Sequence, residues 1–147
     1  MSTITEQIQR LIQQAPTDQA RADLQTIAPV LSAVASRLQH LQYYLLQTVE
    51  QRWVMTTLQH REQPHVTKTV IYAYPSLEAV KATQPNPDPQ LLALPVPTVE
   101  ILFQLLAIDP VESMIFLEQN QPSGVEISRE LLQSLIAQHL QPPMDIA

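Results

Sequence analysis

The N-terminal third of the chain places apolar residues at helical spacing. Thr3 and Glu6 form the pattern of a capping box, in which each side chain satisfies a free backbone N–H of the first turn. The apolar positions that follow recur every three to four residues: Ile4, Ile8, Leu11 and Ile12. The pattern predicts a short amphipathic helix over residues 3–14, which Pro16 ends.

A second and longer helical pattern follows, which we call the leucine seam. Its members alternate steps of three and four residues: Leu24, Ile27, Leu31, Val34, Leu38, Leu41 and Leu45. Thr17 or Asp18 can cap this element, and Pro29 falls inside it, where a proline removes one intrahelical hydrogen bond. The pattern predicts either one kinked helix over residues 18–48 or two helices that meet at Ala28 and Pro29.

The leucine seam has two interpretations. In the first, it packs against the sheet of its own domain, as amphipathic helices commonly do. In the second, it is a self-association surface through which two copies form a homodimer. Few charged residues flank the seam, although charges at such positions usually set partner choice in coiled coils. The second interpretation therefore has the weaker support.

After Gln51 the apolar period changes from that of a helix to that of a strand. Residues 53–58 and 69–74 are rich in β-branched and aromatic types, and a polar loop separates them. We expect an antiparallel hairpin with a long loop. Short apolar runs at residues 91–94 and 113–117 predict two further strands.

Three further helices are expected among and after these strands. Their expected N-caps are polar side chains: Ser76 before residues 77–82, Thr98 before residues 99–106 and Ser128 before residues 129–140. Gly124, the one glycine of the chain, is expected in a turn over residues 121–124 that leads to the last helix.

This order of elements predicts an α+β fold in a single domain, residues 1–147. N-terminal helices, of which the second is long and Pro-kinked, precede a small mixed or antiparallel sheet of about four strands with two or three helices. We divide the domain into a helical extension over residues 1–50 and an α+β region over residues 52–141. A chain of this length can form one hydrophobic core without disulfides, and it contains no cysteine.

Composition limits the classes of partner. Charged residues make up 15% of the chain, and 8 Lys+Arg against 14 Asp+Glu give a net charge of −6. Nucleic-acid binding needs clustered cations, and the sequence has no such cluster. No apolar run reaches the ~18 residues of a membrane-spanning helix, and the N-terminus has no signal-peptide pattern. We therefore expect a cytoplasmic protein whose partner is another protein.

The sequence contains no catalytic or metal-binding pattern. His60 and His65 lie in a polar loop at a spacing that matches no zinc motif. Asp109, Glu112 and Glu118 surround one predicted strand, where acidic residues are ordinarily the solvated ends. With one glycine, the chain cannot form a phosphate-binding loop or a nucleophile elbow. We expect no enzyme activity, no cofactor and no metal site.

Large aromatic and sulfur-containing side chains provide the candidate binding site. Such residues serve either in the core or as anchors of protein interfaces. Because side chains of a strand alternate between its faces, one face can pack on helices while the other stays open to a partner. The candidate partner-binding residues are Trp53, Met55, Tyr72, Tyr74 and Phe103.

The order of segments in residues 52–140 resembles the SseB N-terminal domain family. The matching pieces are Trp53-Val54-Met55, Val70-Ile71-Tyr72-Ala73-Tyr74-Pro75-Ser76, the helix Val99 to Leu106, Ile115-Phe116-Leu117, and Gly124-Val125-Glu126-Ile127-Ser128-Arg129-Glu130-Leu131. The chain departs from the family where an Asn-Pro pair is usual, because Gln121 separates Asn120 from Pro122. The resemblance implies an interaction module.

The size, the Gln- and Pro-rich composition and the helical extension are similar to cyanobacterial carboxysome assembly factors of the CcmS type. This resemblance implies a non-enzymatic, chaperone-like protein that binds a peptide tail of a carboxysome shell hexamer protein. One alternative is a Rubisco-type or other small chaperone or regulator that acts through its N-terminal helices. Another is a general SseB-like interaction module. Deletion of residues 1–50 is the experiment expected to separate the helices from the sheet as the binding surface.

Overall fold

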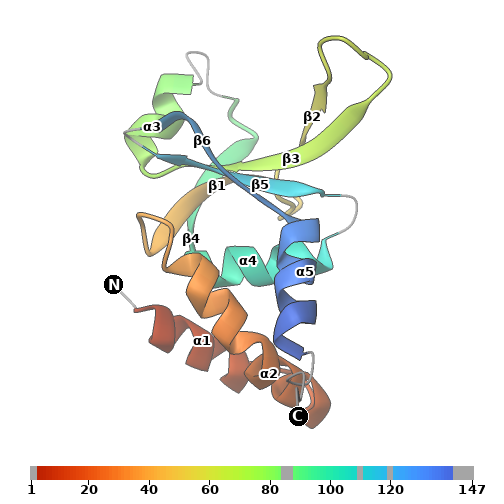
Figure 1. Ribbon diagram of the computed structural model, residues 1–147. Helices are drawn as coiled ribbons and strands as arrows, with labels where there is room; N and C mark the ends of the chain where they lie inside the picture. Colours follow the sequence, from red (N-terminus) through yellow and green to blue (C-terminus); the bar gives the residue numbers. More distant parts are fainter. Residues whose placement is uncertain (1–2, 84–87, 109–110, 119–120, 141–147) are drawn as a thin grey trace.

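The computed structural model describes residues 3–83, 88–108, 111–118 and 121–140, and it has an α+β fold in which the N-terminal helices come first (Figure 1). In these residues the elements in chain order are α1 (Ile4–Gln13), α2 (Asp18–Ala35), β1 (Gln42–Thr48), β2 (Thr56–Gln59), β3 (Thr67–Ala73), α3 (Leu77–Thr83), β4 (Leu91–Pro97), α4 (Thr98–Ala107), β5 (Ser113–Glu118), β6 (Gln121–Ser128) and α5 (Arg129–Leu140).

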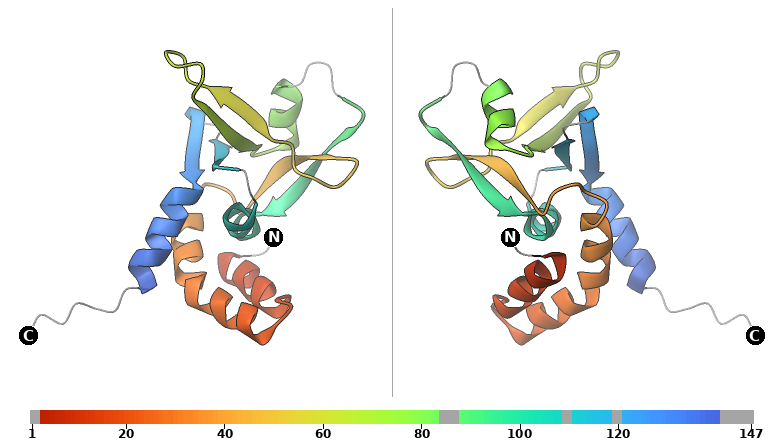
Figure 2. Two further views of the ribbon diagram at one scale, coloured as in Figure 1. Left: turned by 90° about the vertical axis from the view of Figure 1, so that its right-hand side faces the viewer. Right: turned by 90° about the vertical axis from the view of Figure 1, so that its left-hand side faces the viewer.

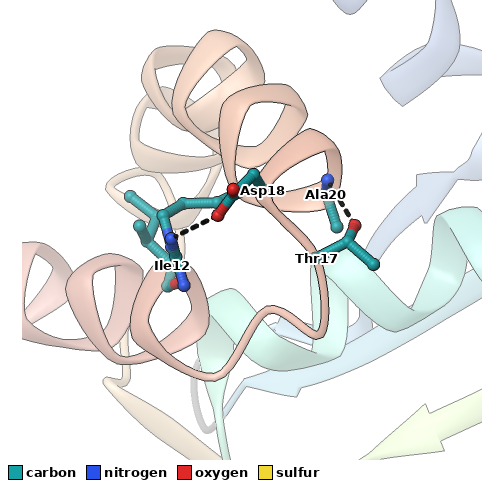
Figure 3. Close-up of polar contacts among 5 residues, drawn as sticks. Ile12, Thr17, Asp18 and Ala20 are labelled. Carbon is teal, nitrogen blue, oxygen red and sulfur yellow. Dashed lines mark hydrogen bonds and ion pairs between the residues drawn. The ribbon is translucent and has the colours of Figure 1, made fainter.

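Both N-terminal helices begin as the sequence predicts. The capping box of α1 is complete, since the Glu6 backbone N–H donates to Thr3 Oγ1 over 3.1 Å and the Thr3 N–H donates to the Glu6 carboxylate. Thr17, rather than Asp18, caps α2 by accepting from the Ala20 N–H over 3.0 Å (Figure 3). These caps fix where each helix starts.

The short joint between α1 and α2 is closed by Arg21. Its guanidinium pairs with Asp18 over 3.1 Å and donates through Nε to the backbone carbonyl of Ile12 near the end of α1. A cation at a helix C-terminus also interacts favourably with the helix dipole. The two helices therefore form a closed hairpin.

The prediction of helix over residues 18–48 is wrong beyond residue 35. Helix α2 ends at Ala35 with Pro29 inside it, and residues 42–48 form the strand β1. The cause is the spacing of Leu41 and Leu45, because a step of four residues fits both a helical period and a strand period of two. The first 50 residues are therefore not a purely helical extension.

The strands form two sheets instead of one. Four strands pair in the order β2-β3-β5-β6, with β3 and β5 parallel and the other pairs antiparallel, which confirms a mixed sheet and the predicted hairpin. The expected strand at residues 91–94 is β4, but it pairs with β1 in a separate two-stranded sheet. Backbone hydrogen bonds of 2.7 and 2.9 Å between Tyr44 and Tyr74 join β1 to the end of β3.

One hydrophobic core lies between the sheets and four of the helices. Helices α1, α2, α4 and α5 gather on one side of the sheets, and α3 lies on the other (Figures 1 and 2). Five members of the leucine seam are buried, namely Leu24, Leu31, Val34, Leu38 and Leu45, whereas Ile27 and Leu41 are half-buried. The described structure thus supports the first interpretation of the seam, packing within its own chain.

Two expected turn and cap residues have other roles. Thr98 is the first residue of α4 rather than its cap, and its hydroxyl donates to the His40 carbonyl over 2.8 Å. Gly124 lies inside β6 at φ +73°, opposite an irregularity in the β5–β6 pairing, rather than in a turn before the helix. Ser128 caps α5 as predicted, accepting from the Leu131 N–H over 2.9 Å.

Among the described residues, the helices are all too short or too polar to cross a lipid bilayer.

We expect Gly124→Ala to lower the free energy of unfolding by about 2 kcal/mol, because a side chain disfavours positive φ and its Cβ would lie 2.9 Å from the Phe116 carbonyl oxygen. Urea denaturation measures the change. Gln133→Ala, an exposed change on α5, is the control and should stay within about 0.5 kcal/mol of the wild type. Equal stability of the two variants would contradict this account of Gly124.

Candidate protein-binding groove

Three adjoining hollows follow one side of α4. The central hollow has a volume of about 380 Å³ and is enclosed by α1, α2 and α4. It shares Gln104 with a hollow of about 350 Å³ beside Trp53, and it shares Leu11, Gln14 and Glu100 with one of about 250 Å³ beside Pro97. We call these three hollows together the α4 groove.

The central hollow is lined mainly by apolar side chains. Leu11 comes from α1, Leu24 and Ile27 come from α2, and Phe103 comes from α4. Three of them are half-buried and pack against the core with part of their surface, while Leu24 is buried. An apolar, concave lining with a polar rim is typical of a site that holds a side chain of a partner.

The hollow beside Trp53 is bounded by the turn that follows β1. Trp53, Met55 and Ile108 supply its apolar lining, and Met55 is 43% exposed. A hydrogen bond of 2.8 Å from the Thr48 N–H to the Arg52 carbonyl closes this turn, and Gln51 within it adopts φ +66°. Seen along α4, this turn and α5 lie on opposite sides of the helix (Figure 2). The groove therefore opens away from α5.

The structure brings three of the five candidate partner-binding residues to this groove. Trp53, Met55 and Phe103 line it, and Gln104 connects their two hollows. Tyr72 lies on β3 and Tyr74 directly follows this strand; they alternate with the core residues Ile71 and Ala73, so they point to the other face of the sheet. These two tyrosines therefore lie apart from the groove.

Sequence reasoning missed Glu100 and Gln104 as parts of the site. The available signal is their spacing with Phe103 and Ile108, since steps of three to four residues place side chains on one face of a helix. This face of α4 combines polar with half-buried apolar residues, whereas the opposite face is fully buried.

Gln7 sets the position of α1 beside α4. Its side chain is 4% exposed, donates to the Leu41 carbonyl over 2.8 Å and accepts from the Val99 N–H over 3.0 Å. Thr98 adds bonds from its N–H to Leu41 and from its hydroxyl to His40. We call this set of bonds the Gln7 bridge. It joins α1 to the chain before β1 and to the first turn of α4.

The free edge of β4 is a poor alternative docking site. The Thr98 N–H points towards β1, so alternation directs the N–H positions of residues 91, 93, 95 and 97 away from it. Pro95 and Pro97 have no N–H, and the Leu91 N–H donates to the Asp88 carbonyl. Prolines protect the edges of sheets in this way, and Ala93 is left as the donor on this side.

A buried cluster of titratable side chains lies near the start of β1. The Tyr43 hydroxyl donates to Glu118 Oε1, and His40 Nε2 lies 3.5 Å from Glu118 Oε2. The Glu118 side chain is 0% exposed, so the expectation of a solvated strand end is wrong for this residue. Burial and the hydrogen bond to Glu118 raise the pKa of the Tyr43 hydroxyl well above its usual range.

The geometry of this cluster favours a structural role. Both His40 Nε2 and Glu118 Oε2 are inaccessible to solvent, and each faces the other. A general acid or base must reach the proton that it transfers, and a substrate cannot reach these two atoms here. The cluster links the loop before β1 to the end of β5.

The remaining acidic and histidine candidates lie apart from one another and from this cluster. His60 Nδ1 accepts from the Glu62 and Gln63 N–H groups, and Glu112 accepts from the Thr69 N–H over 3.0 Å. Asp109 lies outside the described residues. Among residues 3–83, 88–108, 111–118 and 121–140, no three His, Asp or Glu side chains are grouped so that they could hold a metal ion.

The chain matches no protein-family model, no curated protein and no solved structure.

We expect Tyr43→Phe to remove an alkaline loss of stability. The raised pKa keeps Tyr43 neutral in the folded state, whereas an unfolded tyrosine ionises near its ordinary value of about 10. The stabilisation is therefore fully present below about pH 10 and is lost as the pH rises further. Urea denaturation across about pH 8–11 should show this loss in the wild type and in the control Tyr72→Phe. A similar loss in Tyr43→Phe would contradict the assignment.

We expect Gln7→Leu to lower the free energy of unfolding by about 1–3 kcal/mol, because it leaves the buried Val99 N–H without its acceptor. Gln9→Leu, an exposed change on the same helix, provides the control for added apolar surface. Urea denaturation compares the two. If both variants unfold at the same urea concentration, the Gln7 bridge does not hold α1 in place.

Proposed function

We propose that this protein is a non-enzymatic assembly factor or chaperone that holds a short peptide segment of a partner protein in the α4 groove. The observation that supports the proposal most strongly is that Trp53 and Met55 line one hollow, Phe103 lines the next, and the two hollows share Gln104. Trp53 and Met55 come from the segment between β1 and β2, and Phe103 comes from α4. Large anchors in adjoining hollows are typical of peptide-binding grooves.

The dimensions of the groove support a side-chain binding mode. Its two larger hollows, of about 380 and 350 Å³, are each large enough for one or two apolar side chains of a partner. The blunted β4 edge disfavours an alternative in which a partner strand extends the two-stranded sheet at β4. The bound segment is therefore held mainly through its side chains.

In the specific form of the proposal, the segment is the tail of a carboxysome shell hexamer protein and the protein assists shell assembly in the cytoplasm. This form depends on the resemblance to carboxysome assembly factors. The low charge of the chain and its net charge of −6 agree with a protein partner rather than a nucleic acid.

Action through the N-terminal helices, as in a Rubisco-type chaperone, is the second candidate. It is favoured by the fact that α1 and α2 form two walls of the central hollow through Leu11 and Ile27. Deletion of residues 1–50 cannot separate the two candidates, because the deleted part includes β1 and the buried Tyr43 and Leu45. Point variants on the groove are required instead.

We expect tail peptides of shell hexamer proteins to bind the wild type in calorimetric titrations, and Met55→Asp to weaken binding at least tenfold, because it places a charge in the apolar hollow. Leu92→Asp is the matched control, since Leu92 is 58% exposed on β4 and lies outside the groove. This control should bind like the wild type.

Absence of tail-dependent binding would overturn the carboxysome form of the proposal. Equal affinity of Met55→Asp and the wild type would instead show that peptides do not use the hollow beside Trp53. A selective loss in Ala20→Asp, an α2 residue of the central hollow, with Met55→Asp unchanged would favour action through the N-terminal helices.

A further inference from the structure

The rim of the central hollow contains two carboxylates and no cation. Glu100 is half-buried, and the described part of the chain offers it neither a hydrogen bond nor an ion pair. Asp23 accepts one hydrogen bond, from the Gln19 amide over 2.9 Å, which leaves its charge unbalanced. An apolar hollow with two unbalanced negative charges at its rim favours a ligand that supplies a positive charge there.

Each end of the groove has one arginine. Arg10 lines the hollow beside Pro97, and Arg52 lines the hollow beside Trp53. Within the described residues, neither arginine forms an ion pair with Asp23 or Glu100. The groove therefore has an arginine at each end, while its two carboxylates line the central hollow, and Glu100 also borders the hollow beside Pro97.

We propose that the occupant of the α4 groove is a peptide segment in which an apolar side chain fills the central hollow and a single Lys or Arg lies beside it, with neutral or acidic residues at both ends. This inference rests on the proposed function, since it specifies the chemistry of the segment that the groove binds.

Desolvation provides the selectivity. A peptide that covers the central hollow removes water from Glu100, and an uncharged peptide would leave this carboxylate without a partner. A Lys or Arg beside the anchor supplies the partner, while its apolar stem and charge can pack against the ring of Phe103. A uniformly basic segment binds with lower affinity, because Arg10 and Arg52 repel its ends.

Peptide display with a random octapeptide library tests this chemistry directly. The wild-type protein is compared with the double variant Asp23→Asn/Glu100→Gln. A second double variant, Glu78→Gln/Glu130→Gln, removes the same charge from α3 and α5, away from the groove, and serves as the control. The peptide most enriched on the wild type is then measured by calorimetry against all three proteins at low and high salt.

We expect the wild type and the control to enrich peptides with one Lys or Arg next to an apolar residue. The groove variant should lose the basic preference and bind the selected peptide roughly three- to tenfold more weakly, with a smaller dependence on salt. Enrichment of apolar peptides without a basic residue would overturn this inference and leave the proposed function intact. Enrichment of no peptide by the wild type would overturn both.

Discussion

The Gln7 bridge is the constraint on which the arrangement of the molecule depends. One buried amide satisfies the Leu41 carbonyl before β1 and the Val99 N–H in the first turn of α4, two groups that are 58 residues apart in the chain. A backbone N–H at the start of a helix has no partner within the helix, and leaving it buried and unpaired costs about 1–3 kcal/mol. By meeting this need from α1, the chain fixes the first helix across the start of α4, and the Arg21 side chain adds one hydrogen bond of 3.5 Å from α2 to the Ile12 carbonyl of α1.

The same constraint shapes the surface on which the proposed function depends. Helices α1 and α2 lie beside one part of α4, and the turn after β1 lies beside the C-terminal half of α4. Between them, one face of α4 that carries both polar and apolar side chains stays uncovered. Backbone pairing at the edge of β4 is disfavoured, since Pro95 and Pro97 blunt this edge. The chain has few charged residues, and those that line the groove form no ion pairs with neighbouring side chains among the residues that the structure describes. These charges can therefore define which peptide binds.

Local patterns predicted helix starts well and long-range pairings poorly. Thr3, Thr17 and Ser128 act as caps because a cap depends on residues within one turn. Leu41 and Leu45 misled the helix prediction because a step of four residues fits both periods, and only the pairing of β1 with β4 decides between them. Trp53 and Phe103 were candidates by type, but whether they line adjoining hollows depends on where α4 lies against the turn after β1. The buried contacts of Gln7 and Glu118 gave no signal, since both partners are distant in sequence.

The central claim is that partners bind in the α4 groove. Trp53 is the one tryptophan of the chain and lines this groove, so its fluorescence reports on the site without any label. The most direct measurement is a titration of the Trp53 emission with a binding peptide, either a shell hexamer tail or a peptide selected by display, with calorimetry giving the affinity independently. The account predicts a blue shift that saturates with the calorimetric affinity, because the peptide removes water from the indole. Binding by calorimetry with an unchanged emission spectrum would contradict it.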